Sequence, residues 1–324
     1  MLIGDTFDDI FFHLVHKINR YPQFVSSPRG QKVRESLVVS FELTNPRARL
    51  LSVPARKADY GFAVGEFLWY WTGKRDLESL LYYNKRAAGF SNDGLTVNSA
   101  YGYRLRRRSI FSGVDEQRGL GQSQWETCIE TLANDPDSRR AVMLINLPED
   151  EREAVDGSKD VPCTMSLQFF IRRDEAMGSD EPPRLHLHTL MRSNDVMWGL
   201  TYDLFSFTLF QECMLMELKK LPQFLDLELG SYVHTAGSMH IYERHFEQAG
   251  KIIQEYVDSG FERQPPMRPL EFDDLGELAS IEECLRTGKE ISIFPDDLSK
   301  GGHWMADRLK DHRAKRDREK LANP

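Results

Sequence analysis

The feature that most constrains the fold is a long run, Leu204 to Leu218, with apolar residues on nearly every side. A helix that is hydrophobic all round is buried, so we expect this segment to be the central helix of a layered domain. A strand-like run, Arg184 to Met191, precedes it, and the polar groups of Arg192 to Asp203 lie at the join. These groups are candidates for ligand contacts, because a crevice beyond strand ends holds small molecules.

The composition excludes several classes of protein. The chain has 324 residues, enough for one large domain or two ordinary ones, and its net charge of −8 includes no strongly basic half. We therefore expect no nucleic-acid partner. The four cysteines contain no Cys-x-x-Cys pair, which argues against a zinc site and a disulfide scaffold. Without a signal-peptide pattern or a membrane-spanning run, the expectation is a soluble cytoplasmic protein without a membrane partner.

Hydrophobic periodicity predicts an interleaved set of helices and strands. The expected helices cover residues 5–19, 63–71, 77–85, 123–132, 204–218 and 240–256, and the expected strands cover 36–44, 141–147, 163–171, 184–191, 226–234 and 290–294. We expect loops over 26–34, 89–94, 149–160, 174–183 and most of 257–300, and a solvated helix or disorder from residue 307. There is no Gly-x-Gly-x-x-Gly and no P-loop, so a dinucleotide-binding or NTPase fold has no support.

Each chemically suggestive residue also has a plain structural explanation. Cys163 is either a core cysteine or a nucleophile that needs a nearby cation such as Arg192. Glu66, in an apolar helix, either points outward or is an acid with a raised pKa that transfers protons. His186 and His188 share one face of a strand and could bind a metal, but no carboxylate or cysteine has ligand spacing, so hydrogen-bonded histidines are favoured.

The order of these residues is more informative than any one of them. In chain order they are Arg29, Glu66, Tyr101-Gly102, Asp137-Ser138-Arg139-Arg140, Pro162-Cys163, Gln168-Phe169, Arg192-Ser193-x-Asp195, Asp203 and His240-x-Tyr242. This order and spacing resemble the thymidylate synthase family from about residue 5 to residue 255. The family signature ends in Asn where this chain has Asp203, an exchange similar to the cytidylate hydroxymethylase branch, which includes the CMP hydroxymethylase of mildiomycin biosynthesis.

The resemblance implies a fold and a set of roles. The fold would be an α/β (α+β) layered thymidylate synthase-like domain over residues 1–256, with a large mixed sheet, a buried central helix and a homodimer formed through the sheet. Residues 257–324 would be an extension of that domain with a charged tail. The catalytic residues would be Cys163, which attacks C6 of a pyrimidine nucleotide, with Glu66 and Tyr101.

The resemblance also implies the binding residues. The nucleotide phosphate would be bound by Arg29, Arg192 and Ser193, and by Arg139 and Arg140 from across the dimer interface. His240 and Tyr242 would hold the sugar, while Asp195 and Gly199 would lie on the side of the co-substrate, 5,10-methylenetetrahydrofolate. No metal is implied.

Asp203 is the position that suggests the base. A protonated Asp donates to N3 of cytosine and accepts from its N4 amino group, and an ionised Asp matches an N3-protonated cytosine. In either arrangement uracil would be mismatched, and an unpaired buried polar group costs about 1–3 kcal/mol. We therefore expect a cytosine nucleotide, and we expect burial to raise the pKa of Asp203.

Other departures from the synthase pattern favour hydroxymethylation. Thr164 stands where synthases have His, Met191 stands where they have Gln, and residues 88–94 replace the Trp-rich folate loop. A charged tail replaces the short hydrophobic carboxyl terminus, so the resemblance implies that water, rather than hydride, completes the reaction. The long surface insertions and the Arg- and Asp-rich, Lys-poor composition resemble those of actinomycete proteins, and the resemblance to the antibiotic-pathway enzymes, which use the ribonucleotide, therefore implies CMP over dCMP. The alternatives are a dCMP hydroxymethylase, a thymidylate synthase or dUMP hydroxymethylase, a non-catalytic nucleotide-binding protein and a histidine-based metallohydrolase.

Overall fold

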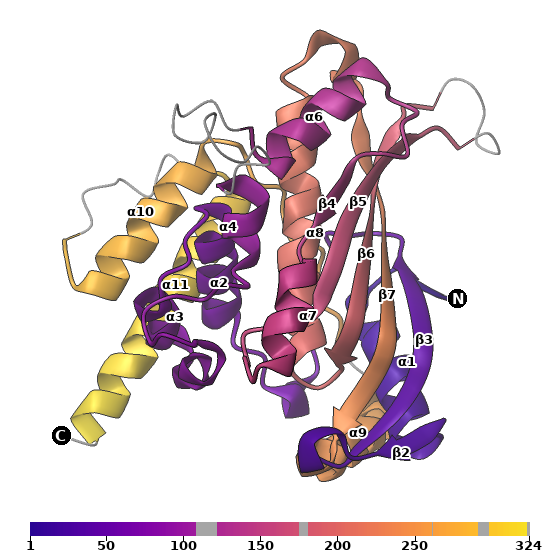
Figure 1. The fold of residues 1–324 in the computed structure, drawn as a ribbon, viewed down its shortest axis with the longest axis vertical. Coiled ribbons are helices and arrows are strands. Elements are labelled where there is room, and N and C mark those ends of the chain that lie inside the picture. Colours follow the sequence, from indigo (N-terminus) through magenta and orange to yellow (C-terminus); the bar gives the residue numbers. More distant parts are fainter. Residues whose placement is uncertain (108–121, 175–180, 261, 291–297, 323–324) are drawn as a thin grey trace. The chain divides into compact units, whose positions relative to one another are not determined.

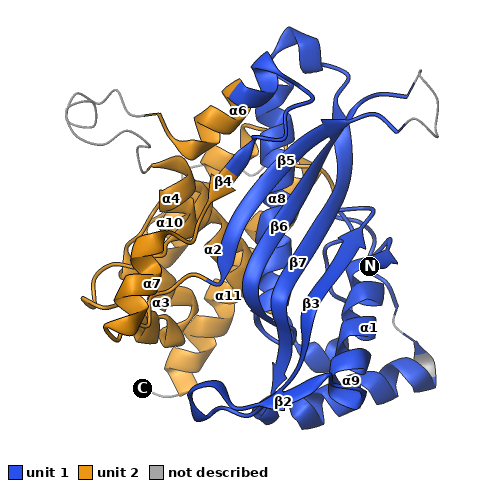
Figure 2. Cartoon of the chain, turned by 45° about the vertical axis from the view of Figure 1, so that its right-hand side comes forward, with its two compact units in different colours: residues 1–58, 131–142, 163–267 blue, residues 59–130, 143–162, 268–324 orange. Residues whose placement is uncertain are grey.

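The computed structural model describes residues 1–107, 122–174, 181–260, 262–290 and 298–322. The chain folds into two compact units whose sequences interleave, as the two colours of Figure 2 show. The first unit comprises Met1–Ala58, Thr131–Val142 and Cys163–Met267, and the second comprises Asp59–Glu130, Met143–Pro162 and Arg268–Pro324. The division predicted at residue 256 stays a prediction.

A mixed sheet forms most of the first unit (Figure 1). Its strands are β1 (Leu2–Gly4), β2 (Phe24–Ser26), β3 (Val33–Leu43), β4 (Val142–Leu144), β5 (Thr164–Arg172), β6 (Arg184–Asp195) and β7 (Glu228–Tyr242). The spatial order is β1-β3-β7-β6-β5-β4, and β2 also pairs with β3. β5 is antiparallel to β6, β6 is parallel to β7, and β7 is antiparallel to β3.

Three helices accompany the sheet in this unit: α1 (Phe7–Arg20), α8 (Gly199–Leu218) and α9 (Phe246–Ser259). In α1, the Thr6 side chain accepts a hydrogen bond from the Asp9 amide, and the apolar residues at helical spacing are buried. α8 connects β6 to the parallel strand β7, packs on both strands, and is buried on almost all sides. The predicted central helix is therefore confirmed, although it begins at Gly199.

The second unit is mainly helical. Its elements are α2 (Tyr60–Trp71), α3 (Leu77–Tyr83), η3 (Lys85–Phe90), α4 (Tyr101–Arg106), α7 (Pro148–Val155), α10 (Asp274–Thr287) and α11 (Lys300–Ala322). α6 (Gln124–Asn134) begins in this unit and ends in the first. A capping box starts this helix: the Ser123 amide donates to the Glu126 carboxylate, and the Glu126 amide donates to the Ser123 hydroxyl. The remaining short turns are η1 (Pro28–Gly30), η2 (Pro54–Arg56), η5 (Pro222–Phe224) and η6 (Glu243–His245), all in the first unit.

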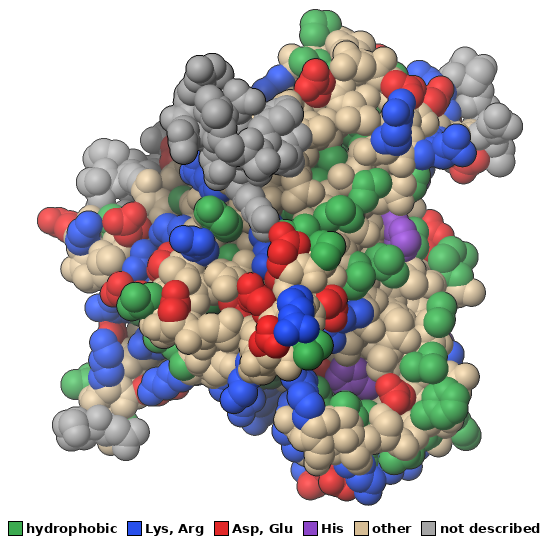
Figure 3. Space-filling view, viewed as in Figure 1, with side chains coloured by type: hydrophobic (Ala, Val, Ile, Leu, Met, Phe, Trp, Pro, Cys, Tyr) green, Lys and Arg blue, Asp and Glu red, His purple; other side chains and the backbone are tan. Residues whose placement is uncertain are grey.

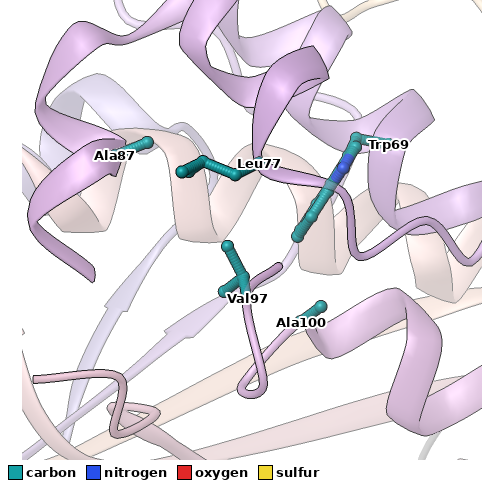
Figure 4. Close-up of a cluster of buried hydrophobic side chains, with 5 residues drawn as sticks. All are labelled: Trp69, Leu77, Ala87, Val97 and Ala100. Carbon is teal, nitrogen blue, oxygen red and sulfur yellow. The ribbon is translucent and has the colours of Figure 1, made fainter. Parts of the chain in front are cut away.

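Two contacts within the second unit hold its elements together. A small hydrophobic cluster joins α2, α3 and the segment before α4, and Figure 4 shows its residues, Trp69, Leu77, Ala87, Val97 and Ala100. In addition, the buried guanidinium of Arg104 on α4 binds both carboxylate oxygens of Asp150 on α7, at 2.5 and 2.7 Å. A bidentate pair of this kind fixes orientation as well as distance.

Several predicted elements were wrong. Residues 149–160 were expected to be a loop, but they include most of α7, whose Asp150 is buried against Arg104. Most of 257–300 was expected to be loop, but α10 buries Leu275, Leu278 and Ile281. The strand predicted over 290–294 lies almost entirely outside the described residues.

The predictions for the tail and for residues 240–256 also need correction. The charged tail is a helix, α11, but it is not fully solvated, because Met305, Leu309 and His312 are buried. The helix predicted from residue 240 begins only at Phe246, because β7 continues to Tyr242. Among the described residues, no helix has both the length and the apolar character needed to cross a bilayer.

Candidate active site

Neighbouring strands of the first unit bring most of the predicted site residues to one end of the sheet. The amide of Arg192 donates to the carbonyl oxygen of Cys163 at 2.9 Å, which places the start of β5 beside the end of β6. Across the next pair of strands, Asp195 of β6 is opposite His240 of β7, and His240 is in turn opposite Glu35 of β3. The register thus places a thiol beside a guanidinium in one row of the sheet, and a carboxylate opposite an imidazole in another row, three residues further along β6.

Cys163, immediately before β5, is partly exposed. Burial of its sulfur raises the pKa of the thiol, while the positive charges of Arg192 and Arg29 lower it and the carboxylate of Asp203 raises it. The two arginines are the kind of neighbour that a reactive thiolate needs. Because burial outweighs them, the thiol in the structure keeps its proton at neutral pH.

Asp203 lies in the second turn of α8 and is half-buried. Burial raises the pKa of its carboxyl group to about 7, against a lowering by the hydrogen bond that Asn194 Nδ2 donates to its Oδ2 at 2.6 Å. A Cβ atom at Gly199 would come within 3.2 Å of both Asn194 Nδ2 and Asp203 Oδ2. The glycine at the start of α8 therefore leaves room for this hydrogen-bonded pair.

His240 and Tyr242 occupy the end of β7, with their rings edge-to-face at 4.9 Å. Burial lowers the pKa of His240, so its imidazole is neutral at pH 7 and can both donate and accept. Glu35 accepts hydrogen bonds from the hydroxyls of Ser26 and Ser238, each at 2.6 Å, and these bonds lower the pKa of its carboxyl group. Glu35 is thus a fixed acceptor beside His240.

The four arginines predicted to bind phosphate, Arg29, Arg139, Arg140 and Arg192, are exposed. Arg29 has φ 51° and ψ 33°, a left-handed conformation that non-glycine residues rarely adopt and that is typical of functional loops. Arg139 and Arg140 precede β4, and the Arg139 carbonyl accepts from Gln168 Nε2 at 2.9 Å. Among the described residues, neither the Arg139 nor the Arg140 guanidinium group makes an ion pair, and no contact there connects either residue with Cys163.

Glu66, on α2, and Tyr101, at the start of α4, both belong to the second unit. The Tyr101 ring lies on the side of α2 that carries Glu66. Glu66 is half-buried, and it shares a helix face with Tyr70, one turn further on. The rings of Tyr70 and Tyr101 stack at 5.3 Å with an interplanar angle of 8°. Gly102 permits this contact, because a Cβ there would collide with the Tyr70 backbone. A carboxyl and a phenol are therefore near neighbours on α2 and α4.

Two groups at the end of β6 and just after it, the Asp195 carboxylate and the Trp198 ring, could contact a flat heterocycle. Asp195 uses Oδ1 to accept from the Met197 amide at 2.9 Å, and Oδ2 makes no hydrogen bond with the described residues. Trp198 is partly exposed, and its ring lies edge-on to Tyr202 at 5.5 Å. The second carboxylate oxygen of Asp195 can therefore accept from a ligand N–H, and the Trp198 ring offers an aromatic surface.

A comparison with models of protein families matches residues 10–267 to "Thymidylate synthase". The chain belongs to the thymidylate synthase family. It is also 30% identical over 282 residues to the deoxyuridylate hydroxymethyltransferase of Bacillus phage SP01, covering 85% of this chain. A deoxyuridylate hydroxymethyltransferase of Delftia phage PhiW-14 is 26% identical over 226 residues, 67% of this chain. The chain spans 65% and 55%, respectively, of the length of these two relatives.

Among solved structures, a thermostable thymidylate synthase A from Bacillus subtilis has the same fold. The TM-score is 0.58 at 19% sequence identity, and the match covers 82% of this chain and 87% of that one. The predicted thymidylate synthase-like fold, a mixed sheet packed by helices, is therefore confirmed. The cytidylate branch and the dimer remain predictions.

The family predictions differ in how the structure places them. In the first unit, the strand pairing places Cys163 beside Arg192 and Asp195 opposite His240, and a Cβ at Gly199 would approach Asn194 and Asp203. The histidines considered as metal ligands are hydrogen-bonded, His186 to Ser231 and His188 to Thr235, each at 3.0 Å. Within the described residues no group of three His, Cys, Asp or Glu side chains is arranged to hold a metal.

Sequence reasoning missed two residues of this site. Asn194 occupies the unspecified position of Arg-Ser-x-Asp, and nothing in the linear pattern shows that it contacts Asp203. Glu35 stands at the edge of the predicted strand 36–44, and its position opposite His240 depends on the pairing of β3 with β7. Alternating exposure along β3 could have indicated a polar side chain, but not its partner.

Proposed function

We propose that this chain transfers a hydroxymethyl group to C5 of cytidine 5′-monophosphate, with methylenetetrahydrofolate as the one-carbon donor. The observation that carries the proposal is Asp203, whose pKa of about 7 lets the carboxyl group be neutral near neutral pH. A neutral carboxyl offers one donor and one acceptor, as the N3 and N4 edge of cytosine requires. Family membership supports one-carbon chemistry on a pyrimidine nucleotide.

The catalytic sequence follows from the residues in place. Cys163 forms a bond from sulfur to C6, which makes C5 nucleophilic, and the charges of Arg192 and Arg29 favour the thiolate. C5 forms a bond to the one-carbon unit of methylenetetrahydrofolate, which is at the oxidation level of formaldehyde. The C5 proton is removed and the bond from that carbon to the folate nitrogen breaks, so tetrahydrofolate leaves and an exocyclic methylene remains on C5. Water adds its oxygen to the methylene carbon and loses a proton, and the S–C6 bond breaks, which restores the C5–C6 double bond and releases Cys163. We assign Glu66 and Tyr101 to the proton transfers and to directing the water.

Binding roles follow the same placement. We assign the phosphate to Arg29, Arg192 and Ser193, because guanidinium groups match phosphate geometry. His240 and Tyr242 would hold the sugar, and Asp195 would accept from the pterin. Whether the sugar is ribose or deoxyribose rests on the composition alone, and we favour ribose.

We further propose that two copies associate through the open face of the sheet. In Figure 3, seen in the same direction as Figure 1, hydrophobic and histidine side chains gather over the strands of the first unit. Val38 is 76% exposed and Leu190 is 37% exposed, so a second copy could cover apolar surface there. In such a dimer Arg139 and Arg140 would serve the partner's phosphate site.

A mixing experiment tests the shared site. Cys163→Ser and Arg140→Ala are each expected to be inactive, but mixing them after dissociation should restore up to about a quarter of the wild-type turnover, because one site in a mixed dimer keeps both residues. Cys163→Ser mixed with itself is the control. Failure to restore activity in a mixture shown to contain mixed dimers would contradict the shared site.

A second candidate is hydroxymethylation of deoxyuridylate. It is favoured by the names of the two phage relatives, which are 30% and 26% identical to this chain. Asp203 favours a cytosine base instead. The same chemistry on dCMP, and methyl transfer in place of hydroxymethyl transfer, are distinguishable by their products.

The test is mass analysis of products after incubation with methylenetetrahydrofolate and CMP, dCMP or dUMP in parallel. We expect a hydroxymethyl group on CMP. The same gain on dCMP alone would overturn the ribose assignment, and a gain on dUMP alone would overturn the role of Asp203. A methyl group on any substrate would contradict the water step. Nucleotide binding without product in both the wild type and Cys163→Ser would indicate a non-catalytic protein.

A further inference from the structure

A neutral carboxyl group alone does not select a pyrimidine. With its proton on one oxygen it complements cytosine, and with its proton on the other it presents acceptor and donor in the reverse order, which complements N3–H and O4 of uracil. Something must therefore fix which oxygen of Asp203 carries the proton. The proposed preference for cytosine depends on that choice.

Among the described residues, Asn194 is the group that can decide which oxygen of Asp203 carries the proton. Asn194 Nδ2 donates to Asp203 Oδ2 at 2.6 Å, and an oxygen that accepts this bond favours the carbonyl form. Asp203 Oδ1 makes no hydrogen bond with the described residues, so it is the oxygen left to carry the proton. The carboxyl group then presents a donor at Oδ1 and an acceptor at Oδ2, in that order only.

Asn194 is held firmly enough for this task. Its side chain is 3% exposed, and its backbone lies in the ladder between β6 and β7, opposite Met239. Its amide oxygen is buried and makes no hydrogen bond with the described residues, so its contribution is the N–H that it donates to Asp203. A buried polar side chain with one such contact is costly to keep unless it has a function.

We propose that Asn194 is a specificity-determining positioning residue: by donating to Oδ2 it fixes the order of donor and acceptor on Asp203 and so selects cytosine over uracil. Asn194 acts through Asp203 and does not itself contact the base. This inference rests on the proposed function for its direction, because the preferred base is the one that matches the fixed order.

The test compares Asn194→Leu, which keeps the size of the side chain and removes the donor, with wild type. The readout is the ratio of kcat/KM for CMP over UMP and for dCMP over dUMP, so that sugar preference does not interfere. In a Cys163→Ser background, the ratio of the dissociation constants of the same pairs gives an answer independent of turnover. Asn194→Ala serves if the leucine variant does not fold.

We expect each ratio to fall at least about tenfold toward one, because the carboxyl group can then carry its proton on either oxygen and the hydrogen-bond mismatch that disfavours uracil is removed. Ser206→Ala is the matched control. Ser206, on α8, is buried as Asn194 is, and its hydroxyl makes no hydrogen bond with the described residues. Its ratios should equal those of wild type. Unchanged ratios in a folded Asn194 variant would overturn the inference.

The same data keep the two proposals apart. A wild-type preference for uracil would overturn the cytosine assignment, but a loss of that preference in Asn194→Leu would still support the role of Asn194. A wild-type preference for cytosine that survives in Asn194→Leu would leave the proposed function standing and overturn the role of Asn194.

Discussion

The two halves of α8 carry buried carboxyl groups in opposite environments. Glu212, 3% exposed, is paired with Arg47 at 2.6 Å and with the fully buried Arg49. Asp203, nine positions earlier, has the neutral amide of Asn194 as its one hydrogen-bond partner among the described residues. A carboxylate matched by two cations fixes a helix in the core. A carboxyl matched by one amide keeps a proton that a ligand can use.

The largest effect on stability should come from removing the charged half of this comparison. Glu212→Gln leaves Arg49 buried without its counter-charge, and breaking a buried pair costs about 3–5 kcal/mol. Urea denaturation should show this loss in the free energy of unfolding. Glu217→Gln, on the same helix and paired with the exposed Lys220, should lose less than about 1 kcal/mol. Equal losses in the two variants would mean that Arg49 does not depend on Glu212.

At Asp203, in the first half of α8, the large effect should be on the preference between cytosine and uracil substrates. Asp203→Leu removes both the donor and the acceptor that the base would meet, so neither pyrimidine is matched. We expect the ratio of kcat/KM for cytosine over uracil nucleotides to fall toward one, by about tenfold or more, since each polar group left unpaired costs about 1–3 kcal/mol. Steady-state kinetics with CMP, UMP, dCMP and dUMP measures this. A ratio within a few-fold of wild type would remove Asp203 from base recognition.

A smaller effect should appear in the pH dependence of stability. The pKa of Asp203 is raised from 3.8 to about 7, so the folded protein binds the proton more tightly than the unfolded chain. Its contribution is complete below about pH 4 and is lost as pH rises through about 7. Relative to Asp203→Asn, wild type should therefore lose up to about 4 kcal/mol between pH 4 and pH 8, because the shift is about three pKa units at about 1.4 kcal/mol each.

Urea denaturation of both proteins across that range gives the difference directly, and the common pH dependence of all other groups cancels. A difference that stays constant with pH would show that the pKa of Asp203 is not raised. A difference of the opposite sign would mean that the carboxylate is stabilised in its ionised form.

The sequence predicted the core of the fold better than its surface. α8 was predicted because apolar residues on every side leave burial as the only stable arrangement, and α1 because one face is apolar throughout. α7 was missed because its residues are charged, although Pro148 followed by acids is a typical helix start. α10 was missed because acidic residues mask the spacing of Leu275, Leu278 and Ile281.

The candidate site divided in the same way. Motif residues such as Cys163 and Arg192 were predicted as site residues because their order along the chain is specific. Asn194 and Glu35 were not, because a side-chain contact such as Asn194 to Asp203, or a strand register such as Glu35 to His240, is a property of the folded chain. His240 was found, but on a predicted helix, because periodicity does not show where β7 ends.

The separation of roles along α8 also bears on how such proteins diverge. Because Arg47, Arg49 and Glu212 anchor the helix away from Asp203, the residue that matches the base can change while the anchor stays in place. An asparagine codon becomes an aspartate codon by one purine exchange at its first position. A lineage could therefore exchange the side chain that meets the base through a single transition mutation, without first acquiring a compensating change at Arg47, Arg49 or Glu212.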